Sequence, residues 1–168
     1  MNKKNVMIKI LSRRTEATGS LFEEAEGEEY EDLPEECEDT EGEEPTEMLV
    51  EGRLLEGEER VELVYEESEL SGMEGSVTCV GFDQSNRGLL SMMRSGTVST
   101  ALVFEENKRH ICIYRTPFSD FEVCSYALRV DNRLLEEGWI ELDYLIEIHG
   151  AQAERCRMTL SIHEIPQF

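Results

Sequence analysis

Residues 139–149 read Trp-Ile-Glu-Leu-Asp-Tyr-Leu-Ile-Glu-Ile-His, and their apolar side chains recur at every second position. One face of an extended strand would carry five apolar side chains: Ile140, Leu142, Tyr144, Ile146 and Ile148. The other face would carry Glu141, Asp143, Glu147 and His149, with Leu145 as the only apolar exception after Trp139. A helical period would scatter the apolar set around the axis. The stretch therefore predicts a strand with one buried and one wet face, as in an antiparallel sheet.

The same alternation recurs along the chain in short runs separated by turn sequences. We predict further strands at residues 6–11, 47–55, 61–66, 77–82, 89–94, 97–104, 110–114, 121–130 and 156–163. Residues 132–137 can form one helical turn that ends at Gly138. Many short strands at hairpin spacing favour a barrel or a sandwich. We predict an all-β antiparallel barrel of about eight to ten strands, which removes sheet edges and can hold a small ligand.

The charge of the chain is concentrated in one segment. The formal net charge is −22, and 15 of the 38 acidic residues lie between residues 23 and 47, where no Lys or Arg occurs. The other 23 acidic residues face 16 Lys and Arg, so the rest of the chain is only mildly acidic. We predict a single barrel domain over residues 1–168 with a long acidic loop, residues 23–47, after the first strand. Like-charge repulsion and scarce apolar residues predict that most of this loop is mobile.

Composition argues against several classes of protein. Nucleic-acid binding needs a concentrated basic patch, and the sequence offers none apart from Lys3, Lys4, Arg13 and Arg14. The acidic charge disfavours anionic membrane surfaces, and no apolar run approaches the roughly 20 residues of a membrane span. We predict a cytoplasmic protein that binds neither nucleic acid nor membranes.

Cysteine and histidine spacing predicts neither a metal site nor a cofactor. The five cysteines, Cys37, Cys79, Cys112, Cys124 and Cys156, form no CxxC pair. We interpret them as free thiols in a reducing compartment, with a disulfide framework, a metal site or a reactive thiol as alternatives. The last two strands hold His149 and His163 at opposite ends of their hairpin, so these two are not expected to share a metal. Motifs of phosphate-binding loops and of nucleophilic serine hydrolases are missing.

Arg94 has the clearest chemical consequence. It ends the run Leu-Leu-Ser-Met-Met-Arg over residues 89–94, in which Leu90, Met92 and Arg94 share a face. If this face points into the barrel, the guanidinium needs an anion or other acceptors. Three readings remain open: an internal ion pair, for which Glu66 is a candidate; an anchor for a ligand carboxylate or phosphate; or exposure at the rim.

Other residues could contribute polar groups to the same interior. The hydroxyls of Tyr65, Tyr114 and Tyr144 are candidate polar handles, although each can equally be a core tyrosine. The acids that follow Tyr65, namely Glu66, Glu67 and Glu69, can supply paired carboxylates or a charged strand end that leads into a loop.

A set of motifs in fixed order resembles a known family. The motifs are Asn-Val-Met-Ile-Lys-Ile-Leu-Ser (5–12), Leu-Val-Tyr-Glu-Glu-Ser (63–68), Met-Arg-Ser-Gly-Thr-Val (93–98), Leu-Val-Phe-Glu-Glu (102–106), Ile-Tyr-Arg-Thr-Pro-Phe (113–118) and Gly-Trp-Ile-Glu-Leu-Asp-Tyr-Leu-Ile-Glu-Ile (138–148). In that order they resemble the YwiB-like family, small bacterial proteins with a domain of unknown function. The resemblance covers nearly the whole chain except the acidic segment, and it implies a calycin-like, lipocalin-related β-barrel.

The resemblance implies no reaction, because the family has no assigned activity. Arg94, Gly96, Tyr114 and Thr116 match recurrent positions of the family. The chain departs from the family at Ser119, where a Gly is usual, and in its longer acidic insert.

These observations leave three functions open. The first is a non-catalytic barrel that binds a small amphipathic or anionic ligand, with Arg94, Tyr65, Glu66, Tyr114, Thr116 and Tyr144 as candidate binding residues. The second is an interaction module that uses the acidic loop on a basic protein, and the third is an enzyme with its site in the barrel. Monomer and dimer both remain open.

Overall fold

The computed structural model describes residues 2–17, 20–22, 45–69 and 73–165. They form ten strands and one helical turn: β1 (Asn2–Glu16), β2 (Thr46–Glu56), β3 (Arg60–Glu66), β4 (Val77–Asp83), β5 (Asn86–Ser95), β6 (Thr100–Phe104), β7 (Arg109–Arg115), β8 (Asp120–Arg133), α1 (Leu134–Glu137), β9 (Trp139–Ile148) and β10 (Glu154–Glu164). Most of the predicted acidic loop, residues 23–44, lies outside the described residues, and Thr46 and Glu47 open β2.

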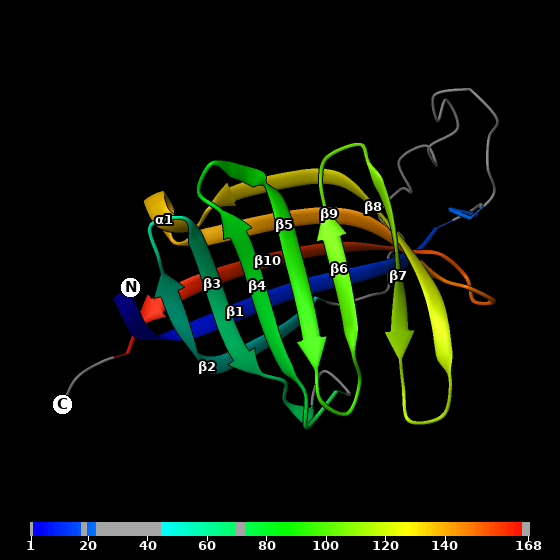
Figure 1. Ribbon diagram of the computed structural model, residues 1–168, viewed down its shortest axis with the longest axis horizontal. Helices are drawn as coiled ribbons and strands as arrows, with labels where there is room; N and C mark the ends of the chain where they lie inside the picture. The colour runs from blue at the N-terminus through cyan, green and yellow to red at the C-terminus, as the bar shows by residue number, and fades with distance from the viewer. Residues whose placement is uncertain (1, 18–19, 23–44, 70–72, 166–168) are drawn as a thin grey trace.

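All ten strands belong to one antiparallel sheet that curls into a nearly closed barrel (Figure 1). The strand order is β6-β5-β4-β3-β2-β1-β10-β9-β8-β7, so the first strand pairs with the last. The two end strands, β6 and β7, meet beside an isolated bridge between Ser99 and Arg115. Curling brings the two ends of the sheet together and leaves few unpaired edge groups. The predicted all-β antiparallel barrel is confirmed.

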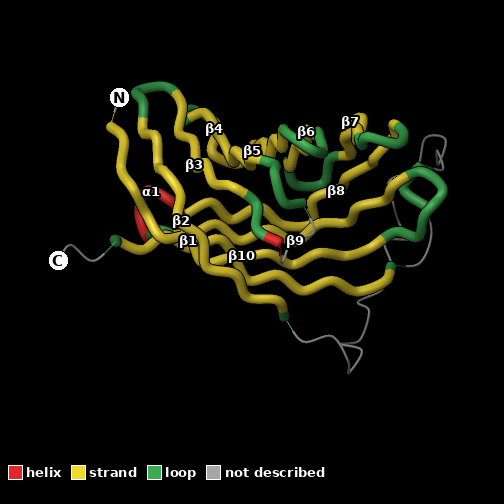
Figure 2. The backbone as a smooth tube through the Cα atoms, turned by 90° about the horizontal axis from the view of Figure 1, so that it is seen from below, coloured by secondary structure: helices red, strands yellow, loops and turns green. Residues whose placement is uncertain are grey.

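The interior is packed by the side chains that the period-two pattern assigns to one face. On β9, Ile140, Leu142 and Tyr144 are all buried. On β1, Val6, Ile8 and Ile10 are buried in the same core cluster. In Figure 2 β3 to β6 form the upper wall, and β1, β10 and β9 form the lower wall. Burial of the inner faces of both walls supplies the apolar stabilisation of the barrel.

A second apolar cluster lies on the outer face of β8 and β9, where residues 17 and 20–22 cover the sheet. Its buried members are Ala17, Leu21, Cys124, Tyr126, Leu145 and Ala153. The prediction that Glu147 lies on a wet face is wrong, because its residue exposure is only 8%. Its carboxylate accepts hydrogen bonds from the backbone N–H of Leu21 at 2.5 Å and from the Ser20 hydroxyl at 3.2 Å. This cover also explains why the outward-facing Leu145 is apolar.

One local feature ends at its predicted boundary, and one strand begins later than predicted. The helical turn α1 ends at Gly138, which takes a left-handed φ of 81°. The strand predicted at residues 97–104 begins only at Thr100. Gly96, with φ at 130°, interrupts the chain before it. No helix in the described ranges is long and apolar enough to cross a membrane.

Candidate functional site

Four polar side chains form a cross-strand row on the inner face of the upper wall. Tyr65 on β3 pairs with Thr78 on β4, Thr78 pairs with Arg94 on β5, and Arg94 pairs with Thr100 on β6. Direct cross-strand partners lie close enough for their side chains to interact. The neighbouring inward positions on β5 are apolar, since Leu90 and Met92 are buried. The row is therefore a polar band set in an apolar interior.

Arg94 is held inside the barrel by a buried carboxylate and a hydroxyl. Its Nη2 lies 3.3 Å from Glu67 Oε1, and its Nε donates a hydrogen bond of 3.1 Å to Thr78 Oγ1. The Thr78 hydroxyl donates to Glu67 Oε1 at 2.5 Å. The side chains of Arg94 and Glu67 are only 12% and 2% exposed. A buried charge is tolerated only when it is paired and hydrogen-bonded, and this triad meets both conditions.

Two tyrosines present neutral hydroxyls to the same interior. Burial raises the pKa of Tyr65 well above its ordinary value, and the adjacent Glu67 carboxylate raises it further. Burial also raises the pKa of Tyr144, whose hydroxyl is hydrogen-bonded with Cys156. The ring of Tyr144 packs against Phe104 with centroids 4.6 Å apart. Both phenols therefore stay protonated and can donate or accept hydrogen bonds.

The lower wall contributes a second row with an arginine at its end. Arg14 on β1 pairs with Cys156 on β10, and Cys156 pairs with Tyr144 on β9. The side chain of Arg14 is 60% exposed, and its Nη1 lies 3.7 Å from Glu154 Oε2. The row thus runs from the buried Tyr144 to a cation at the barrel mouth.

A cavity of about 300 Å³ lies between the two rows. Besides Arg14, Tyr65, Glu67, Arg94 and Tyr144, its lining is mainly apolar and includes four methionines: Met48, Met73, Met92 and Met158. The volume lies at the lower end of the roughly 300–1,000 Å³ typical of small-molecule sites. A pocket that combines apolar side chains with convergent polar groups has the composition of a ligand site.

The structure brings together three of the six residues proposed from sequence. Arg94, Tyr65 and Tyr144 all line the cavity. Glu66 does not join them: it is exposed and borders a separate outer groove of about 410 Å³. Because side chains alternate along a strand, Tyr65 and Glu67 point inward and Glu66 points outward. The internal partner of Arg94 is therefore Glu67.

The other two proposed residues lie elsewhere in the barrel. Tyr114 is partly buried and packs against the core from β7, outside the lining of this cavity. Thr116 organises the turn between β7 and β8, where its hydroxyl donates to the Ser119 carbonyl at 2.8 Å and accepts from the Ser119 N–H at 3.1 Å. These contacts give Thr116 a local structural role in that turn.

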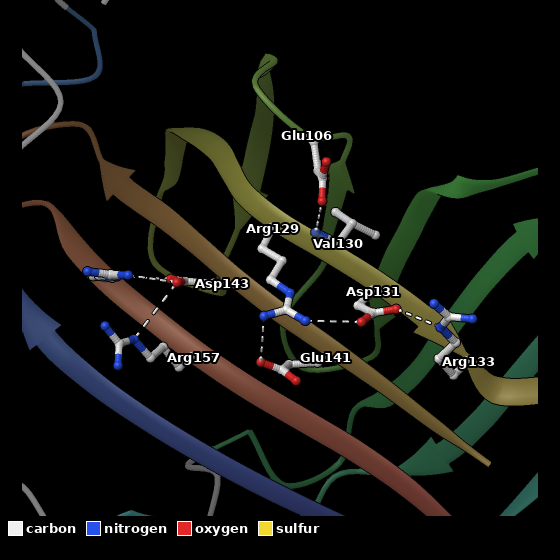
Figure 3. A network of polar contacts seen from close by, with 9 residues as sticks. Glu106, Arg129, Val130, Asp131, Arg133, Glu141, Asp143 and Arg157 are labelled. Atoms are coloured by element: carbon white, nitrogen blue, oxygen red, sulfur yellow. Dashed lines mark hydrogen bonds and ion pairs between the residues drawn. The ribbon is translucent and has the colours of Figure 1, made fainter. Parts of the chain in front are cut away.

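The outer face of β8 to β10 carries a separate set of ion pairs (Figure 3). Asp131 lies 3.1 Å from both Arg129 and Arg133. Asp143 lies 2.7 Å from Arg155 and 3.8 Å from Arg157. The hydrogen bond from Arg129 is the main cause that lowers the pKa of Asp131. The two Asp131 pairs involve arginine side chains that are 56% and 55% exposed, so each contributes little stability. The Arg155–Asp143 pair is partly buried, with side chains 17% and 18% exposed.

The described residues contain no cluster of three or more His, Cys, Asp or Glu side chains suited to a metal ion. The four cysteines in these ranges, Cys79, Cys112, Cys124 and Cys156, are free thiols.

Comparison with known proteins assigns the chain to a family. The model of a domain of unknown function, DUF1934, matches residues 33–160. The chain belongs to the DUF1934 family. The matched region of this DUF1934 chain holds Tyr65, Glu67, Arg94 and Tyr144, and it begins after β1, which carries Arg14.

A solved structure supports the fold of this DUF1934 chain. The crystal structure of the ywiB protein from Bacillus subtilis aligns with a TM-score of 0.63 and 18% sequence identity, covering 95% of this chain and 92% of that chain. Among curated proteins, no sequence matches. The resemblance to the YwiB-like family drawn from the motifs is confirmed.

Proposed function

We propose that this protein is a non-catalytic binding barrel, calycin-like in design, which holds one small amphipathic ligand in its interior. The observation that carries the proposal is the cavity of about 300 Å³, where the polar triad meets an apolar wall. Barrels of about eight strands can already hold one small ligand, and this barrel has ten. Convergent polar groups orient such a ligand, and the apolar lining supplies most of its affinity.

The lining favours a ligand with a flexible or irregular apolar body. Met48, Met92 and Met158 contribute unbranched, polarisable side chains that adapt to different shapes. Tyr65 and Tyr144 add neutral hydroxyls, which accept or donate hydrogen bonds without a net charge. This combination fits an amphipathic molecule better than a highly charged one.

We further infer that the protein works in the cytoplasm. Free thiols persist in reducing compartments, and the four described cysteines are unpaired with one another. Burial raises the pKa values of Cys79 and Cys124 to about 11, so both remain protonated near neutral pH.

The proposal is tested by filling the cavity. Ser12 lines it from β1, and a Ser12→Phe substitution places an aromatic ring in the space. We expect the native protein to enhance the fluorescence of phenylnaphthylamine, a neutral apolar probe, in a saturable titration. Ser12→Phe should weaken this binding by about tenfold or more, equivalent to about 1.4 kcal/mol.

A matched control places the same ring on the outside. Ser161 on β10 lies in the outward-facing set, and a Ser161→Phe substitution should leave probe binding unchanged. Circular dichroism should establish that both variants keep the native sheet. Equal binding by all three proteins, or no saturable binding by the native protein, contradicts the proposal.

A further inference from the structure

Arg14 is an inward-facing cation at the mouth of the cavity. Ile10, Ser12 and Arg14 occupy successive inward positions on β1, and all three line the cavity. Ile10 is 2% exposed as a residue, whereas the side chain of Arg14 is 60% exposed. The strand therefore runs from the closed interior to the opening, and Arg14 stands where a ligand would enter.

The charge of the cavity lining is set by Arg14. Among the residues that the structure describes, three charged side chains line the cavity, namely Arg14, Glu67 and Arg94. Arg94 and Glu67 compensate each other within a buried ion pair at 3.3 Å. What remains is one positive charge, in a chain whose formal net charge is −22.

The acidic neighbour of Arg14 neutralises it only weakly. Glu154 approaches Arg14 no closer than 3.7 Å, and the two side chains are 43% and 60% exposed. An ion pair of this length in water contributes little, so the guanidinium can exchange Glu154 for another anion at small cost. Arg94, in contrast, already has its Nε and Nη2 engaged by Thr78 and Glu67.

We propose that Arg14 binds the anionic head group of the ligand and that this head group is a carboxylate. The assignment rests on the binding function proposed above. A single planar guanidinium can donate two parallel hydrogen bonds to a carboxylate, and its single positive charge neutralises the single negative charge of the carboxylate. The apolar tail then lies deeper, against Met92 and Met158. A doubly charged phosphate would leave an excess negative charge in an already acidic protein.

Calorimetric titrations with ligands of one chain length test the head group. Octanoate, octanol, octylamine and octyl phosphate share a tail and differ in charge. We expect the native protein to bind octanoate most tightly of the four. If octyl phosphate binds more tightly, the carboxylate assignment fails.

A pair of adjacent arginines provides the matched control. Arg13 precedes Arg14 and falls on the opposite, outward face of β1, so Arg13→Gln changes the net charge equally without touching the cavity. Arg14→Gln should weaken octanoate binding by about ten- to a hundredfold, the range of a lost charge-assisted contact, and leave octanol binding unchanged. Arg13→Gln should leave both unchanged. If the two variants bind octanoate with equal affinity, Arg14 does not bind the head group.

Failure of this inference and failure of the binding function are distinguishable. Suppose that phenylnaphthylamine binds, that Ser12→Phe blocks this binding, and that Arg14→Gln leaves the octanoate affinity unchanged. The barrel then binds ligands, and the head-group assignment is wrong. If no probe binds in the cavity, both proposals are wrong.

Discussion

Glu67 and Arg94 form an ion pair inside the barrel, with Glu67 Oε1 3.3 Å from Arg94 Nη2 and side-chain exposures of 2% and 12%. Thr78, which is fully buried, joins the two through hydrogen bonds. Both members line the cavity, and because their charges compensate each other the pair adds polar groups to the candidate site without adding a net charge.

Removing one member of this pair should destabilise the fold. Glu67→Gln leaves the Arg94 guanidinium buried without its counter-ion, and we expect a loss of about 3 kcal/mol in the free energy of unfolding, measured by urea denaturation. Glu66→Gln, next in sequence but exposed, should change it by less than about 0.5 kcal/mol. The double variant Glu67→Leu with Arg94→Met, which removes both charges, should be more stable than Glu67→Gln alone. Similar stabilities for Glu66→Gln and Glu67→Gln would contradict the assignment.

The outer cover formed by residues 17 and 20–22 should contribute to stability. Leu21 is 7% exposed and packs in the outer apolar cluster, so Leu21→Ala should cost about 2 kcal/mol. Leu49 is 60% exposed, and Leu49→Ala should cost far less. Thermal unfolding of the two variants measures the difference, and an equal melting temperature would rule out a stabilising cover.

Gly96 should be intolerant of any side chain. Its φ of 130° is rarely adopted by L-residues, and an added Cβ would collide with the carbonyl oxygen of Gly75. We expect Gly96→Ala to cost at least about 1–3 kcal/mol. Gly88 has an open surrounding, with only Asn86 Oδ1 nearby at 3.9 Å, so Gly88→Ala should be tolerated. Denaturant midpoints of the two variants decide the comparison, and equal midpoints would mean that the backbone relaxes at Gly96.

Cys79 should react slowly with alkylating agents. Burial, and then the charge of Glu62, raises the pKa of the Cys79 thiol to about 11. The thiolate is therefore scarce until the pH rises toward that value, and at pH about 8 alkylation should be at least about tenfold slower than for a model thiol with a pKa of about 8.5. Mass spectrometry after iodoacetamide treatment measures the rate. A rate equal to that of glutathione would show that the thiol is not shielded.

Most of the barrel could be predicted from the period-two pattern. The alternation on 139–149 identified the inward set correctly at Ile140, Leu142 and Tyr144. Side chains two residues apart share a face of a strand, so Glu67, and not Glu66, lies on the same side as Tyr65. The partner of Arg94 could therefore have been predicted from the sequence. On β1 the inward set continues from Ile10 to Arg14 by the same rule, and this signal points to the cation at the mouth.

Other parts of the site depend on contacts that no local pattern contains. Glu147 is buried because Leu21, 126 positions earlier, folds over it, and strand parity alone places it in water. Tyr114 faces inward from β7 but does not line the cavity. Which inward-facing residues meet depends on where each lies around the barrel and along its axis. The register of the strands and the closure of the barrel depend on how the whole sheet assembles, so a local sequence pattern does not predict them.

Methionine-methyl NMR during a titration with phenylnaphthylamine tests the central claim, that the cavity holds a ligand, most directly. Met92 and Met158 line the cavity, while Met93, the chain neighbour of Met92, is 53% exposed on the outer face. We predict saturable shifts of the Met92 and Met158 methyl signals, caused by the ring current of the bound probe, and an unperturbed Met93 signal. Shifts confined to Met93, or no saturable shift at Met92 and Met158, would contradict binding in the barrel interior.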